Sequence, residues 1–281
     1  QVPLILLFVW GTIAAFCPVS SNDLWLLLRE AADIVASGEI PQVEQYSAVA
    51  AGRPYLAHEW LSGLIFLGIF KLGGGEALTV LRAASMLAML LLLWYSLEKK
   101  ERSFVLAAPL LALAAYTILI RVFVRPHIFT HLFLCVWVFA LAHWRRERWP
   151  GYLIMLVPLQ VLWANLHGGY IFALVLGALM TGTAAVLVWR PGWSKDEGYT
   201  RSDVKALAAL TVCCLAASLV NPNGLGLLEF SLNIGLASDY IKQVVFEWAS
   251  PLGAKYARSY GREAALGMFF LMWLGLALNV K

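Results

Sequence analysis

Long apolar runs constrain the fold of this chain more than any other feature. A helix rises about 1.5 Å per residue, so about 20 apolar residues are needed to cross a hydrocarbon core about 30 Å thick. About eight runs approach this length, and the composition, 61% hydrophobic and 14% charged, agrees. The sequence therefore predicts an all-α polytopic membrane protein that forms one membrane domain over residues 1–281. The predicted spans are 2–18, 76–97, 104–120, 127–144, 150–165, 169–189, 204–220 and 263–280.

Basic residues gather in three loops between these spans, at 98–102, 145–148 and 190–205. The apolar segment 61–72 is short for a span, and it decides how these loops fall. If it lies at the membrane surface as a juxtamembrane helix, all three basic loops share one side, which the positive-inside rule identifies as cytoplasmic. We therefore predict that 61–72 does not cross. The formal charge of +4 then reflects membrane orientation and does not indicate nucleic-acid binding.

The loops on the opposite, outer side collect most of the unusual polar residues. Two outer loops are long, at 19–75 and 221–262. Arginines in an outer loop run against the positive-inside trend and need another reason to be there. One face of the membrane is thus predicted to carry the chemistry. The candidate residues on that face are Asp23, His58, Glu59, Arg121, Arg125, His127, Asn165, His167 and Asn221.

Asp23 has two interpretations. Asn22 is a good helix cap, Arg29 and Asp33 are spaced as an i,i+4 pair, and Gly38 ends the segment, so a helix is predicted here. An acid in the first turn is held ionised by the free N–H groups and the helix dipole. Asp23 either serves that helix start or acts as a general base for an acceptor hydroxyl or amine. Spacing alone does not choose.

His58 and Glu59 come just before Trp60 and open the predicted juxtamembrane helix. Trp60 suits the headgroup level, so this motif is either an anchor with solvated neighbours or a second acidic site. Arg82 lies inside the span 76–97, where a buried cation costs about 2.5–3.5 kcal/mol. It should therefore snorkel outward or meet an anion such as a lipid phosphate.

Arg121, Arg125 and His127 form a polar group at an outer helix end. Arginine offers a planar fork that suits phosphate, so the group is either a lipid-phosphate site or an ordinary interfacial flank. His131 lies one turn from His127, a spacing that can hold a metal, but no further ligand is near in sequence. No cofactor is therefore predicted, and a divalent metal is not indicated.

Asn165 and His167 end a predicted span, and helix capping is their default role. Gly168 and Gly169 are expected to supply the positive φ of a tight turn. Asn221 begins a second turn-forming motif. A role in a site is the alternative for each of these polar residues. The cysteines all lie in apolar runs and indicate neither disulfides nor zinc: Cys17, Cys135, Cys213 and Cys214.

The polar motifs follow one another in a particular order. After the first apolar span come Asp23, Gly38 to Pro41, Tyr46-Ser47, Gly52-Arg53-Pro54, His58-Glu59-Trp60-Leu61, Arg82, Arg125-Pro126-His127, Asn165-Leu166-His167-Gly168-Gly169, Asn221-Pro222-Asn223-Gly224 and Glu247-Trp248 to Pro251. This order resembles the GT-C superfamily of membrane glycosyltransferases. It looks closest to bacterial relatives of the dolichyl-phosphate-mannose protein mannosyltransferases.

The resemblance implies inverting transfer of a sugar from a polyprenyl-phosphate donor on the outer face of a bacterial cytoplasmic membrane. On this analogy Asp23 is the first-loop catalytic acid, with Glu59 as the second acidic candidate. Arg82, Arg121 and Arg125 would bind the donor phosphate. The family often shows two acids together, whereas Leu24 follows Asp23, so metal dependence and catalysis stay open.

Two other functions stay open at this point. One is a GT-C-like protein that has lost catalysis and serves as a structural or lipid-binding subunit of a larger membrane complex. The other is a transporter, which the sequence favours less because it shows no inverted repeat and no matching pair of broken spans. The expected partners are a lipid-linked sugar donor, membrane lipids and other membrane subunits, with no nucleic acid.

Overall fold

The computed structural model describes residues 9, 22–98, 109–115, 123–190 and 198–235. Within these ranges the regular structure is helical, and extended chain pairs only at an isolated bridge between Val43 and Pro54. The predicted all-α class is therefore confirmed. The helices are α2 (Asn22–Ser37), α3 (Trp60–Ser96), α5 (His127–Glu147), α6 (Gly151–Ile154), α7 (Leu156–Leu166), the 3₁₀ turn η1 (Gly168–Tyr170), α8 (Ile171–Trp189), α9 (Arg201–Ala217) and α10 (Leu225–Gly235).

Three of the described helices are long and apolar enough to cross a membrane: α3, α5, and η1 joined to α8. A shorter apolar helix, Gly151–Leu166, consists of α6 and α7. These features are consistent with an integral membrane protein. The predicted spans at 76–97, 127–144 and 169–189 fall on these three helices, whereas those at 150–165 and 204–220 are helical but are not among the helices of membrane-spanning length. The predicted spans at 2–18, most of 104–120, and 263–280 lie outside the described residues.

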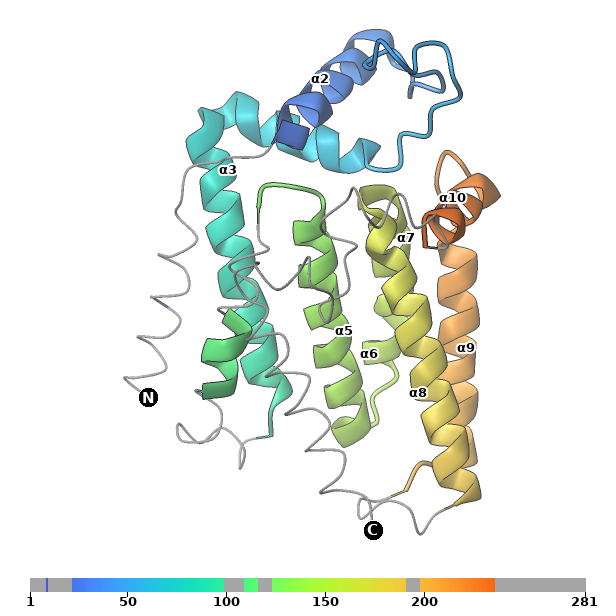
Figure 1. Cartoon of the computed structure of the whole chain (residues 1–281). Coiled ribbons are helices and arrows are strands. Elements are labelled where there is room, and N and C mark those ends of the chain that lie inside the picture. The colour runs from blue at the N-terminus through green and yellow to red at the C-terminus, as the bar shows by residue number, and fades with distance from the viewer. Residues whose placement is uncertain (1–8, 10–21, 99–108, 116–122, 191–197, 236–281) are drawn as a thin grey trace, which may run out of the picture.

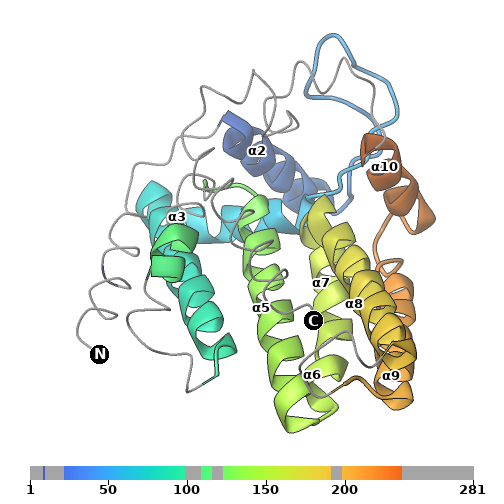
Figure 2. The ribbon, with the colours of Figure 1, turned by 60° about the horizontal axis from the view of Figure 1, so that its bottom comes forward.

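A sharp kink divides α3 into two parts. Gly73 and Gly74 have non-helical dihedrals, and Gly74, at φ 61° and ψ −150°, occupies a region that residues with a side chain avoid. The part before the kink, 60–72, lies across one end of the bundle, and the part after it runs beside α5 (Figures 1 and 2). The later part, 75–96, is about 33 Å long at 1.5 Å per residue. The kink separates 61–72 from a part that is by itself long enough to cross, and that 61–72 does not cross stays a prediction.

Helix α2 lies on the first part of α3 at the same end of the bundle (Figure 1). Leu24, Leu28 and Ala31 pack with Phe66 and Leu67 in one buried cluster. The two helices approach closely at Gly63, where an added Cβ would lie 3.0 Å from a backbone oxygen of α2. The acidic side chains of α2 therefore lie at the end of the bundle that 60–72 crosses. The predicted pair between Arg29 and Asp33 is confirmed at 3.0 Å.

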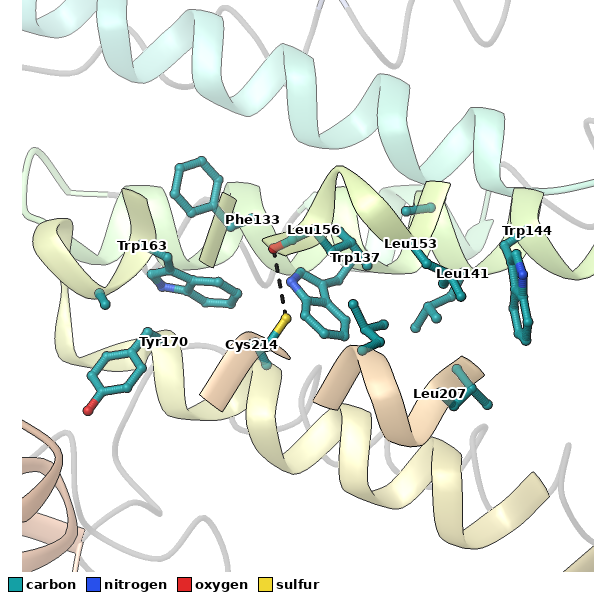
Figure 3. Close-up of a cluster of buried hydrophobic side chains, with 14 of the residues drawn as sticks. Phe133, Trp137, Leu141, Trp144, Leu153, Leu156, Trp163, Tyr170, Leu207 and Cys214 are labelled. Atoms are coloured by element: carbon teal, nitrogen blue, oxygen red, sulfur yellow. Dashed lines mark hydrogen bonds between the residues drawn. The ribbon is translucent and has the colours of Figure 1, made fainter. Parts of the chain in front are cut away.

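The core of the bundle lies between α5, α7, α8 and α9. Its largest fully buried side chains include Trp137, Trp163, Tyr170 and Leu156 (Figure 3). The buried amide of Gln160 donates to the Ser218 hydroxyl at 2.8 Å and to a backbone carbonyl at 3.2 Å. The amide therefore ties α7 to α9 inside the apolar layer, where a buried polar group needs a partner.

The basic loops meet at the opposite end of the bundle from α2. Arg148 pairs with Asp203, Arg146 donates to the carbonyl of Ser96, and Arg145 stacks over the ring of Tyr199. The described parts of the three basic loops therefore share one end, as the positive-inside argument requires. Residues 99–102 and 191–197 of these loops lie outside the described part.

Candidate functional site

A polar cluster forms at the bundle end covered by α2. It draws on the first turn of α2, the start of α3, the segment before α5, and the turn between α7 and α8. These segments are far apart in sequence, and the crossing of 60–72 over the bundle brings them together (Figure 1). The residues that the structure gathers here from the predicted set are Asp23, His58, Glu59, Arg125, His127 and His167.

Asp23 and Arg125 form an ion pair across the cluster. The distance from Arg125 Nη2 to Asp23 Oδ2 is 3.2 Å. The Asp23 side chain is 59% exposed, whereas that of Arg125 is 25% exposed. The pair is therefore open on the side of the carboxylate, where an acceptor hydroxyl could approach.

Glu59 precedes α3, and its side chain does not cap that helix. Its Oε1 atom lies 3.4 Å from Nε2 of His167 and 3.7 Å from Nε2 of His58. The pKa of the Glu59 carboxyl is raised to about 8, chiefly by burial and then by the nearby Glu30 and Asp23, with Arg125 acting in the opposite direction. A carboxyl that titrates near neutral pH is suited to exchange a proton under physiological conditions.

His167 is held from three sides. Its Nδ1 atom accepts from the backbone N–H of Gly169 at 2.9 Å and lies 2.8 Å from the hydroxyl of Thr130. Thr130 in turn accepts from the indole N–H of Trp163 at 3.0 Å. The ring of His127 lies 4.4 Å away, centroid to centroid. Burial, together with the neighbouring histidines, lowers the pKa of His167 well below its usual value, so its ring is neutral at pH 7.

The turn at Gly168 and Gly169 differs from the prediction. Neither residue has positive φ, because the chain continues as a right-handed 3₁₀ turn that needs none. Gly169 is required for a different reason: an added Cβ would overlap the Thr130 hydroxyl and would lie 2.8 Å from Nδ1 of His167. The glycine is therefore required by the close approach of these two side chains.

His58 completes the cluster on the side of α10. Its Nδ1 lies 3.3 Å from the carbonyl of Leu56, and its ring lies 5.0 Å from the ring of Phe230, centroid to centroid. Burial, followed by the influence of His127, lowers the pKa of His58, although the Leu56 carbonyl acts the other way. Helix α10 therefore contacts the cluster at His58, whose side chain remains 32% exposed.

Sequence reasoning missed Glu30, Tyr55 and Thr130. The Glu30 side chain is buried and accepts a hydrogen bond from the Tyr55 hydroxyl at 2.7 Å. Burial raises the pKa of Glu30, which the Tyr55 hydrogen bond partly offsets. A signal was present, because Glu30 follows Asp23 by two helical turns and must share its face. Thr130 carried no such signal.

Asn165 and Asn221 hold the local structure. Asn165 accepts from the indole N–H of Trp60 at 3.2 Å and donates to the carbonyls of Val161 and Val220, both at 2.8 Å. It thereby joins α7 to the start of α3 and the end of α9. Asn221 donates to the carbonyl of Ser218 at 2.7 Å within its own turn. The described contacts thus favour the structural alternative for both residues.

The remaining predicted residues are the two other arginines. Arg82 is only 5% exposed within the later part of α3 and has an interaction partner, as a guanidinium in an apolar helix requires. Arg121 lies outside the described residues.

Across the described part of the chain, no group of three or more His, Cys, Asp or Glu side chains is arranged to hold a metal.

Comparisons of the whole chain with protein-family models, with curated proteins and with solved structures find no match. The polar cluster therefore has to be interpreted from its own chemistry.

Proposed function

We propose that this chain is a membrane glycosyltransferase of the GT-C type, which transfers a sugar from a polyprenyl-phosphate donor to an acceptor on the outer face of the membrane. The observation that carries the proposal is the pairing of Asp23 with Arg125 at 3.2 Å beside the partly buried Glu59 carboxyl. Transfer of a sugar from a phosphate leaving group needs a base for the acceptor proton and a cation for the phosphate charge, and a carboxylate beside a guanidinium offers both.

The proposed reaction inverts the anomeric carbon. The acceptor hydroxyl attacks that carbon while its bond to the phosphate oxygen breaks, and the hydroxyl proton passes to the Asp23 carboxylate. The lipid phosphate leaves with the bonding electron pair, and Arg125 stabilises its charge, with Arg82 and Arg121 as further candidates. Glu59 is the second acidic group of the site.

The membrane arrangement is part of the proposal. We place the chain in a bacterial cytoplasmic membrane with about eight spans, with the end that carries α2 facing outward. The gathering of Arg145, Arg146 and Arg148 at the other end supports this orientation, because basic loops favour the cytoplasmic side. The donor would then reach the polar cluster from the outer leaflet.

A second candidate is a catalytically inactive GT-C-like subunit that has a structural or lipid-binding role in a larger complex. One observation favours it: the Asp23 carboxylate is already engaged by the Arg125 guanidinium. In such a pair the guanidinium occupies a carboxylate oxygen that a base would present to the acceptor hydroxyl. Binding of the donor phosphate to Arg125 would release Asp23 in the first candidate, whereas the pair would persist in the second.

The test is Asp23→Asn in the purified protein, with sugar transfer from a polyprenyl-phosphate donor as the readout. Loss of a general base lowers the rate by about 10² to 10⁴, whereas asparagine starts a helix as well as aspartate does. The matched control is Asp33→Asn, the same change on the same helix outside the cluster. Transfer that survives in Asp23→Asn excludes this residue as the base, and an inactive wild type with every donor tried favours the second candidate.

A further inference from the structure

The Glu59 carboxyl lies between two imidazole rings, one of which presents a hydrogen-bond donor to it and the other an acceptor. Its Oε1 atom is near Nε2 of His167 on one side and Nε2 of His58 on the other, at 3.4 and 3.7 Å. Which ring nitrogens carry protons follows from their other partners, because a backbone N–H can only donate and a carbonyl can only accept.

His167 faces Glu59 with a donor. Its Nδ1 atom accepts from the N–H of Gly169 at 2.9 Å, so in the neutral ring the proton is on Nε2. His58 presents an acceptor to Glu59. Its Nδ1 lies 3.3 Å from the Leu56 carbonyl, which can only accept, so in the neutral ring the proton is on Nδ1 and the Nε2 atom that faces Glu59 carries none. An oxygen between a donor and an acceptor matches the hydroxyl of a protonated carboxylic acid, which both accepts and donates.

Charged and titratable groups face this cluster from every neighbouring element. Among the described residues, the cation that acts on Glu59 is Arg125, whose charge is shared with Asp23 at 3.2 Å. Buried Glu30 contributes a second acid from α2, and α5 contributes two histidines. The groups around Glu59 are Asp23 and Glu30 on α2, His58 beside it, Arg125 before α5, His127 and His131 on α5, and His167 before η1.

We propose that the cluster of His58, Glu59 and His167 holds one proton that neutralises the Glu59 charge, and that binding of a lipid phosphodiester beside Arg125 depends on this proton. The choice of ligand rests on the proposed function. The proton-holding cluster rests on the contacts above.

The dependence follows from the charges. With the proton in place, Glu59 carries no charge, the charges of Asp23 and Arg125 cancel, and an incoming phosphodiester adds one negative charge to that of Glu30. Without it, the ionised Glu59 adds a further negative charge in the same partly buried cluster and repels the ligand. The pKa of Glu59, raised by burial to about 8, places the loss of this proton at mildly alkaline pH. Binding should therefore be strong below pH 8 and weaken above it.

The test measures binding and proton uptake together by calorimetry on the whole protein in nanodiscs, from pH 6 to 10. The probe is dodecyl methyl phosphate, whose single charge does not titrate in this range. We expect wild-type affinity to be constant between pH 6 and 7 and at least about 10-fold weaker at pH 10, with proton uptake on binding above pH 8. Dimethyl phosphate, which lacks the alkyl chain, is expected to bind more weakly, and equal affinity would overturn the assignment to a lipid.

Glu59→Gln should bind the probe with an affinity that does not change over this pH range and without proton uptake. The matched control is Glu39→Gln, which removes an exposed acid at the same end of the molecule and should titrate as the wild type does. Infrared spectra should show a protonated carboxyl at pH 7 that Glu59→Gln lacks. A wild-type affinity independent of pH, a Glu59→Gln variant that titrates like wild type, or no binding at any pH would overturn the inference. Because none of these readouts involves sugar transfer, failure of the enzyme proposal would be seen separately.

Discussion

Gly169→Ala offers the most direct test of the packing that holds the cluster together. An added Cβ would overlap the Thr130 hydroxyl and lie 2.8 Å from Nδ1 of His167, so one of these side chains must move. Forcing a methyl group into a packed interior costs about 1–3 kcal/mol. At about 2–4 °C per kcal/mol for a domain of 150–250 residues, Tm should fall by about 2–12 °C.

The assay is thermal unfolding of the purified protein, with Gly182→Ala as the matched control. Nothing lies within 4 Å of a Cβ at Gly182, and the residue sits inside α8, so alanine there should preserve or raise Tm. A double variant with Thr130→Ala should cost less than the sum of the single changes, because the alanine removes one of the overlapping atoms. A Tm of Gly169→Ala equal to that of wild type would refute the close approach.

Three further predictions concern single residues. Tyr55→Phe removes the hydrogen bond to buried Glu30 and should lower stability by about 1–3 kcal/mol in thermal unfolding; an unchanged Tm would argue against that bond. Asp203→Asn weakens both a helix cap and the pair with Arg148, and should cost about 0.5–2 kcal/mol, again measured by Tm. The folded-state pKa of Glu59, about 8, exceeds its ordinary value of 4.5, so the stability that its proton contributes is present at low pH and is lost as pH rises through 8. Glu59→Gln should therefore gain Tm relative to wild type between pH 5 and 9, and a constant difference would contradict the assigned proton.

Much of the fold could be predicted from the sequence because it depends on local features. Apolar periodicity and length gave the helices, and the charge of the loops separated the two ends of the bundle. The Arg29 and Asp33 pair needs only helical spacing. The separation of 61–72 from the span that follows depended on its short length and on loop charge, and the kink at Gly73 and Gly74 agrees with it.

Some members of the polar cluster could be identified from the sequence, but their pairings could not. Polar residues at helix ends on one side of a membrane can be identified one by one, as Asp23, Glu59 and Arg125 were. Their contacts depend on how helices distant in sequence cross, which no local pattern records. Thr130 is an example, because it matters only where α5 meets the turn that holds His167. Gly169 is another, because its Cβ is excluded by a neighbour from a different helix.

The kink in α3 explains why the cluster lies where it does. A straight helix over Trp60–Ser96 would be about 55 Å long and would carry Glu59 about 24 Å beyond the start of the later part. Gly74, in a conformation that glycine alone adopts readily, instead turns 60–72 across the bundle end. There the Ser62 hydroxyl donates to the Leu166 carbonyl at 2.6 Å, which fixes the start of α3 against the end of α7. That contact sets Glu59 beside His167, so the place of Glu59 in the cluster depends on a glycine 15 residues further along the chain.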